Sequence, residues 1–176
     1  MSMRNENVNP TMVSNYIKHA MDCFLISMAK RYDIKGKTYF NYPNKYYYSD
    51  LGLRNARLNY RQYDPGHIME NIIYNELIRR GYSVDVGVVY DRTEGSNVPK
   101  EIDFIVNDGD RKLYIQSAFK MDTDVKMESE LKSLTLTKDF FKKIVVRTDI
   151  PHNYYDDNGI FHCNLIDFLL EKVELF

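Results

Sequence analysis

The sequence predicts a mixed α/β fold, in which helices pack on a sheet that has both antiparallel and parallel strands. From residue 65 onward, the hydrophobic patterns follow the order helix, three strands, helix, strand, helix. A helix between two strands implies a crossover connection, and a crossover joins parallel strands. A tight Asp-Gly turn between the second and third of these strands implies an antiparallel hairpin. Both kinds of pairing are therefore expected in one sheet.

Length and composition are typical of a folded protein with one ordinary domain, or a small module fused to one. The chain has 176 residues, of which 44% are hydrophobic and 28% charged. No apolar run reaches the ~18 residues that a membrane-spanning helix needs, and the polar start has no signal-peptide core. The two cysteines, Cys23 and Cys163, are far apart and show no metal-type spacing. We therefore expect a cytoplasmic location and no membrane partner.

The net charge of −1 conceals an asymmetry between the two parts of the chain. Residues 1–61 carry ten Lys or Arg against four Asp or Glu, whereas residues 62–176 carry fourteen against twenty-one. This division predicts two modules with different partners. Because nucleic-acid binding depends on cations that neutralise phosphates, the basic N-terminal part is the better candidate for such a contact.

The N-terminal part begins with a predicted helix. Asn9-Pro10-Thr11 is a helix-start pattern, and apolar residues recur at helical spacing as far as Met28. Residues 32–48 alternate aromatic, basic and turn residues, which predicts short strands with a hairpin. A turn or short helix is expected at 49–60.

The C-terminal part starts after Asp64-Pro65-Gly66, the clearest boundary in the chain. An amphipathic helix is predicted at 67–82, and Gly81 is placed to end it. The next elements are predicted as strands at 83–91, 101–107 and 112–119, a helix at about 123–138, a strand at 142–148, a loop at 151–159 and a helix at 164–173. Asn164 is the expected N-cap of this last helix.

The segment 101–120 has the outline of a metal-dependent nuclease hairpin. Asp103 on one strand and Glu70 on the preceding helix are the candidate carboxylates for Mg²⁺ or Mn²⁺. On the second strand, alternation places Gln116, Ala118 and Lys120 on one face. Gln116 supplies no charge and Ala118 stands where a nuclease would carry its lysine, so Lys120 is only a remote substitute.

The N-terminal part contains two further patterns. The tripeptide 36–38, Gly-Lys-Thr, lacks the glycine and the following helix that a phosphate-binding loop needs, so we expect no nucleotide hydrolysis by this chain. Basic residues interleaved with tyrosines can bind phosphates and stack on bases, or they can form a solvated face over half-buried rings. The nucleic-acid-binding candidates are Lys18, Lys35, Lys37, Lys45, Arg54 and Arg57.

Several motifs resemble one family in order along the chain: YYYSDLGLRN, ENIIYNELIRRGYSVDVG, KEIDFIV, YIQSA and NLIDFLL. From about Thr11 to Leu170, the chain resembles the C-terminal portion of predicted prokaryotic AAA-type ATPases, a domain of unknown function catalogued as DUF-4143. The resemblance implies a winged-helix-like segment at 1–62, with 14–26 as its recognition-type helix and 30–40 as its wing. It also implies a PD-(D/E)XK nuclease-like domain at 63–176, with a restriction-endonuclease-like sheet.

Within that resemblance, Glu70, Asp103 and Gln116 fall at nuclease motif positions, with Q-x-A in place of (D/E)-x-K. The expected function is a non-catalytic recognition or regulatory domain of such an ATPase. Its expected partners are an ATPase core, in the same polypeptide or a separate chain, and either DNA or a protein. No cofactor is expected unless the alternative holds, in which the chain is a Mg²⁺- or Mn²⁺-dependent nuclease with a degenerate site. A structural alternative is that Asp103 pairs with a neighbouring Lys or Arg.

Overall fold

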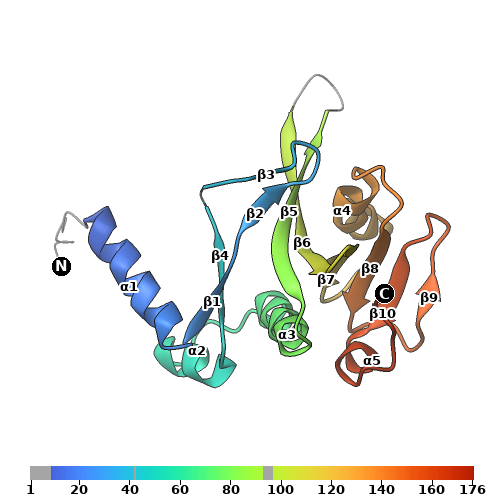
Figure 1. The fold of residues 1–176 in the computed structure, drawn as a ribbon. Helices are drawn as coiled ribbons and strands as arrows, with labels where there is room; N and C mark the ends of the chain where they lie inside the picture. The colour runs from blue at the N-terminus through green and yellow to red at the C-terminus, as the bar shows by residue number, and fades with distance from the viewer. Residues whose placement is uncertain (1–8, 42, 93–96) are drawn as a thin grey trace.

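The protein is built around a sheet of eight strands in the order β3-β2-β5-β6-β7-β8-β10-β9, beside a separate pair formed by β1 and β4 (Figure 1). A computed structural model describes residues 9–41, 43–92 and 97–176. The strands are β1 (Ile26–Ala29), β2 (Arg31–Asp33), β3 (Thr38–Tyr39), β4 (Lys45–Tyr48), β5 (Ser83–Asp91), β6 (Val98–Asp108), β7 (Arg111–Ala118), β8 (Lys142–Arg147), β9 (Tyr154–Tyr155) and β10 (Phe161–Asn164). The helices are α1 (Pro10–Asp22), α2 (Leu51–Arg57), α3 (Pro65–Arg79), α4 (Asp124–Thr135) and α5 (Leu165–Leu169).

The expected mixed sheet is confirmed. β5, β6 and β7 pair antiparallel in sequence, and β7 then pairs parallel with β8 after the crossover through α4. The helices α3 and α5 pack on one face of the sheet, where Ile73, Leu77 and Phe168 are fully buried. On the other face, Leu131 and Leu134 of α4 pack against the strands. These two surfaces are called the α3 face and the α4 face below.

The N-terminal segment contributes strands to both structures. α1 leads into β1, which pairs antiparallel with β4, while β2 lies parallel to β5 in the large sheet and β3 pairs with β2. Strand pairing therefore crosses the predicted domain boundary between residues 62 and 63. In Figure 1, α1 stands at the far end of the molecule from β9.

The first helix is shorter than predicted. The prediction of a helix through residue 26 is wrong beyond Asp22, because the helix ends there in a Schellman motif. The backbone N–H of Leu25 donates to the carbonyl of Ala20, and that of Phe24 donates to the carbonyl of Met21. Phe24 takes the left-handed conformation (φ 58°) that glycine usually supplies. No glycine marks this end, so the apolar spacing continued past it into β1.

The C-terminal region also differs from the prediction. The predicted helix at 164–173 is wrong beyond Leu169, because Lys172 N–H returns to the carbonyl of Asp167 and Glu171 adopts a φ of 55°. No strand is predicted at 154–164, yet β10 lies parallel to β8 and pairs with the short β9. The N-cap role of Asn164 is confirmed, since its side chain accepts from Ile166 N–H.

A β-bulge in β6 shapes the region of the candidate site. Asp85 pairs with Ile105, but Gly87 pairs with Ile102, so β6 carries one extra residue across this step. Phe104 packs on the α3 face and Ile102 on the α4 face, with Asp103 between them. The bulge thus allows Asp103 and Phe104 to be directed to the same side.

None of the helices in the described part of the chain has the length and apolar character needed to cross a membrane.

Candidate functional site

A lysine lies between three carboxylates on the α3 face. The Lys45 ammonium is 2.7 Å from Glu70 Oε1, 2.6 Å from Glu101 Oε1 and 3.5 Å from Asp103 Oδ1. These side chains come from β4, α3 and β6, which are separate stretches of the sequence. They are mostly buried, since the Asp103 side chain is 11% exposed and that of Lys45 is 23% exposed. This group of four is called the carboxylate–lysine cluster.

Regular secondary structure directs each of these side chains into the cluster. Lys45 and Tyr47 are two residues apart on β4, so they lie on the same face of the strand. The Tyr47 ring stacks on Tyr74 of α3 at 4.0 Å, and its hydroxyl donates to Glu70 Oε1 at 2.7 Å. The stacking fixes β4 against α3 and so holds Lys45 next to Glu70.

Further hydrogen bonds close the cluster. Glu101 also receives the guanidinium of Arg31 at 2.6 Å. Asp103 Oδ2 accepts the backbone N–H of Ser117 at 2.9 Å, and Gln116 Oε1 accepts the backbone N–H of Asp103 at 3.4 Å. The side chains of Asp103 and Gln116 therefore satisfy backbone groups beyond Phe104 and Ile115, the last residues paired between β6 and β7.

The charges in the cluster lie close enough to shift one another's pKa values. Burial and, to a smaller extent, the Glu70 carboxylate raise the pKa of Asp103, Lys45 acts in the opposite direction, and the net result is a pKa of about 7. Burial alone would lower the pKa of Lys45, but the charges of Asp103 and Glu70 raise it on balance. Lys45 therefore stays an ammonium ion, whereas Asp103 can exchange a proton near neutral pH. That property suits an acid–base group as well as a structural one.

The nuclease candidates are only partly brought together. Glu70 and Asp103 meet at Lys45, and Gln116 contacts the backbone of Asp103. Ala118 belongs to the core of the α4 face. Because side chains alternate along a strand, Gln116 is directed to the same face, and Ser117 between them is directed toward the α3 face. Lys120 is exposed beyond the end of β7, and no contact between it and the carboxylates is found in the described residues.

The arrangement does not fit the metal that the nuclease hypothesis implies. Glu70 and Asp103 would be its ligands, but the ammonium of Lys45 lies where their charges would attract a cation. Among the residues that the structure describes, no three His, Cys, Asp or Glu side chains are grouped so that they could hold a metal ion. A bound metal would require Lys45 to move away.

A pocket of about 730 Å³ opens beside the cluster. Lys45, Tyr47 and Glu70 of the cluster region line it. The rest of the lining includes Tyr46, Arg54, Arg61, Tyr63 and His67, and also Asp64, whose carboxylate lies 2.8 Å from His67 Nδ1. This surface, called the basic pocket below, combines groups that bind phosphate with rings on which a base can stack.

The nucleic-acid-binding candidates do not form one surface. Lys45 and Arg54 line the basic pocket, whereas Lys18 lines a groove along α1. Lys35 and Lys37 line a different pocket on the α4 face, which is formed by the β2–β3 turn and Tyr114. Arg57 is exposed on α2. The basic residues of this segment are thus divided over three pockets or grooves and the exposed surface of α2.

Sequence reasoning missed several residues of the site. Glu101 was overlooked although it stands two residues before Asp103 on the same strand, the spacing that places two side chains on one face. The sequence does not indicate that Tyr47 and Arg31 belong to the site, because the residues they contact are distant in sequence. Lys45 was selected as a phosphate ligand, and the structure places it among carboxylates as well.

The comparisons with known proteins agree with the DUF4143 part of the resemblance. A family model for a domain of unknown function, DUF4143, matches residues 65–165. An uncharacterized protein of Haemophilus influenzae is 36% identical over 162 residues, which cover 90% of this chain and 37% of that protein. The uncharacterized protein MJ1544 of Methanocaldococcus jannaschii is 27% identical over 158 residues, which cover 81% of this chain and 34% of that protein.

The chain thus spans just over a third of the length of these relatives. No solved structure matches the chain. Because the family model covers more than half of the sequence, the chain belongs to the DUF4143 family of domains of unknown function.

Proposed function

We propose that the chain is a non-catalytic recognition domain, which serves an AAA-type ATPase and binds DNA through the basic pocket. The observation that carries the non-catalytic part is the position of Lys45. Its ammonium satisfies Glu70, Glu101 and Asp103 together, so the carboxylates stabilise a β4–α3–β6 junction and not a metal ion. The link to an ATPase rests on the motif resemblance and on the greater length of the relatives.

The DNA-binding part is supported by the composition of the basic pocket. Arg54, Arg61 and His67 line it next to Tyr46 and Tyr63, and the Tyr63 side chain is 80% exposed. Arginine suits phosphate because its planar guanidinium can donate two parallel hydrogen bonds. The exposed tyrosines offer ring faces to unstacked bases, so single-stranded DNA is the form we expect to bind better.

The test is fluorescence anisotropy of labelled single-stranded and duplex DNA, measured from low to physiological ionic strength. Binding should weaken as salt rises, because cations released from the phosphates drive it. The double variant Arg54→Gln, Arg61→Gln should weaken binding about tenfold or more at low salt. Arg111→Gln is the matched control, because Arg111 is an exposed arginine paired with Asp108 away from this pocket.

The absence of salt-sensitive binding to either DNA would refute the DNA part and leave a protein partner as the remaining candidate. A second assay addresses catalysis. Plasmid DNA is incubated with Mn²⁺ and high protein concentration, with Asp103→Asn as the comparison. Nicking by the native chain that Asp103→Asn abolishes would contradict the non-catalytic assignment and support the nuclease alternative.

A further inference from the structure

A second pocket lies on the α4 face, on the other side of the sheet from the carboxylate–lysine cluster. It has a volume of about 440 Å³ and is lined mainly by lysines and aromatic rings. The lining residues that matter here are Tyr32, Lys35, Lys37, Lys112, Tyr114 and Phe141. Its volume lies within the range of pockets that hold small molecules, about 300–1,000 Å³. This site is called the lysine–aromatic pocket.

Lys112 lines the pocket beside two aromatic rings. Its ammonium lies 5.6 Å from the centre of the Tyr32 ring and 5.6 Å from the centre of the Phe141 ring. Such cation–π contacts are weak compared with an ion pair. Within the described residues, no carboxylate lies within 4.0 Å of this ammonium, so its hydrogens remain available to an anion.

The turn between β2 and β3 fixes two more lysines at the pocket. Asp33 Oδ1 accepts the backbone N–H groups of Lys35 at 3.0 Å and Gly36 at 2.8 Å, and Lys37 adopts a φ of 54°. Gly87 on β5 lets the turn approach the sheet, because a Cβ there would lie 3.0 Å from Ile34 Cδ1. The turn is therefore held in place by its own hydrogen bonds and by packing.

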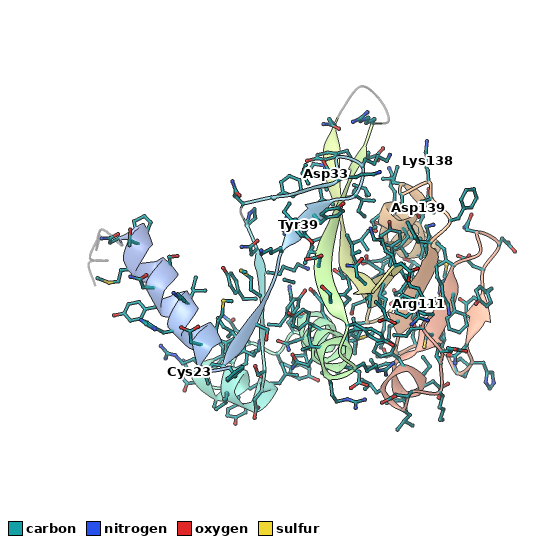
Figure 2. The ribbon with its side chains drawn as sticks, viewed as in Figure 1. Cys23, Asp33, Tyr39, Arg111, Lys138 and Asp139 are labelled. Carbon is teal, nitrogen blue, oxygen red and sulfur yellow. The ribbon has the colours of Figure 1, made fainter. Side chains whose placement is uncertain are left out.

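The acidic groups near the pocket are already engaged. Asp139 Oδ2 accepts the Tyr114 hydroxyl at 2.7 Å, and its Oδ1 lies 3.4 Å from the Lys143 ammonium. Asp85 accepts the Tyr39 hydroxyl at 2.9 Å. Figure 2 labels Tyr39, which lies on β3, and Asp139, which lies near α4. A tyrosine hydroxyl does not neutralise a carboxylate: burial raises the pKa of Asp85, and the charges of Lys30 and Lys112 act in the opposite direction. Among the residues that line the pocket, three lysines face one carboxylate, Asp139, which also lies close to Lys143.

Aromatic surface completes the site. Phe141 is 42% exposed at the mouth, and its ring meets that of Tyr114 edge to face at 6.0 Å. An exposed ring beside three ammonium groups suits a ligand that has both a planar ring and an anionic group. A bare anion would leave the ring unused, and an uncharged ring would leave the lysines unused.

We propose that the lysine–aromatic pocket binds a nucleoside monophosphate or a closely similar planar anion. Lys112, Lys35 and Lys37 bind the phosphate, and Phe141 stacks on the base. This site is independent of the basic pocket and of the proposed DNA binding, because the two pockets share no lining residue.

Isothermal titration calorimetry of the full chain with AMP tests the proposal, with adenosine and inorganic phosphate as separate titrants. AMP should bind more tightly than either part alone. Lys112→Met should weaken AMP binding about tenfold, since it removes a hydrogen bond to a charged group. Phe141→Ala should weaken it about fivefold or more through lost stacking. Lys37→Met, on an exposed turn, provides a lysine variant that should not disturb folding.

The chain offers matched controls for both residue types. Lys138→Met and Phe140→Ala change exposed neighbours that do not line the pocket, so AMP binding should stay within twofold. Undetectable AMP binding at millimolar concentration would overturn the proposal. The proposal would also be overturned if Lys112→Met and Lys37→Met reduced the affinity for AMP no more than the control Lys138→Met does. Equal affinity for AMP and inorganic phosphate would overturn the stacking role of Phe141.

Discussion

The two faces of the large sheet each carry a lysine, and the surroundings of the two lysines differ. On the α3 face, Lys45 is surrounded by Glu70, Glu101 and Asp103, and every charge has a partner of opposite sign. On the α4 face, Lys112 lies between two aromatic rings that compensate its charge only weakly. A lysine that is paired and buried holds elements together, whereas one that is held by rings remains available to a ligand.

The largest expected difference between the faces is in stability. Lys45→Met would leave three carboxylates close together without their shared cation, and breaking a buried ion pair costs about 3–5 kcal/mol. We expect the free energy of unfolding to fall by that amount at pH 7, as measured by urea denaturation followed by circular dichroism. A loss no greater than that of Lys112→Met would show that the cluster is not a structural junction.

The pH dependence of stability sharpens the description of the α3 face. Burial and the Glu70 carboxylate raise the pKa of Asp103 from 3.8 to about 7, so the folded state binds a proton more tightly than the unfolded state does. The stabilisation from this proton is full below pH 4 and is lost as the pH rises through 7.

Asp103→Asn cannot lose a proton. Its free energy of unfolding relative to the native chain should therefore increase by about 4 kcal/mol between pH 4 and pH 8, measured by denaturation at five pH values. Glu128→Gln, in the exposed part of α4, is the control and should leave the difference constant with pH. If the difference in free energy of unfolding between Asp103→Asn and the native chain did not change with pH, the pKa of the Asp103 carboxyl would not be raised.

The smallest effect is expected on the α4 face. Lys112→Met removes two cation–π contacts but no ion pair, so the free energy of unfolding should change by about 0.5–1 kcal/mol. The same urea denaturation measures it, with the exposed Lys138→Met as control. A loss of several kcal/mol would place Lys112 with Lys45 among the structural lysines and would remove the contrast between the faces.

Much of the fold could be predicted from local patterns. The strand β5 begins and ends where its run of alternating residues does, and Gly81, at a φ of 83°, follows α3 as predicted. Other boundaries could not be predicted, because residues without the usual preference occupy the left-handed position. Phe24 and Glu171 end α1 and α5 in the way that Gly81 ends α3, and neither residue type marks a helix end in a sequence.

The candidate site shows the same division. Glu70 and Asp103 could be selected from their positions on a helix and a strand, and the structure brings them to one ammonium. That this ammonium belongs to Lys45 could not be predicted, since β4 reaches α3 only through tertiary packing of Tyr47 on Tyr74. The face of β7 that carries Ala118 packs toward α4. The sequence alone does not reveal which helix covers which face of the strand.

The sequence by itself determined the mixed α/β class, the helix α3, the antiparallel strands and the crossover to β8. These features depend on the periodicity of apolar residues and on turn residues, which act over a few neighbours. Only the tertiary structure decided which charges meet, because Lys45, Glu70 and Glu101 are brought together by packing between separate elements. It also decided which lysines stay unpaired, since the availability of Lys112 depends on the rings that fold around it.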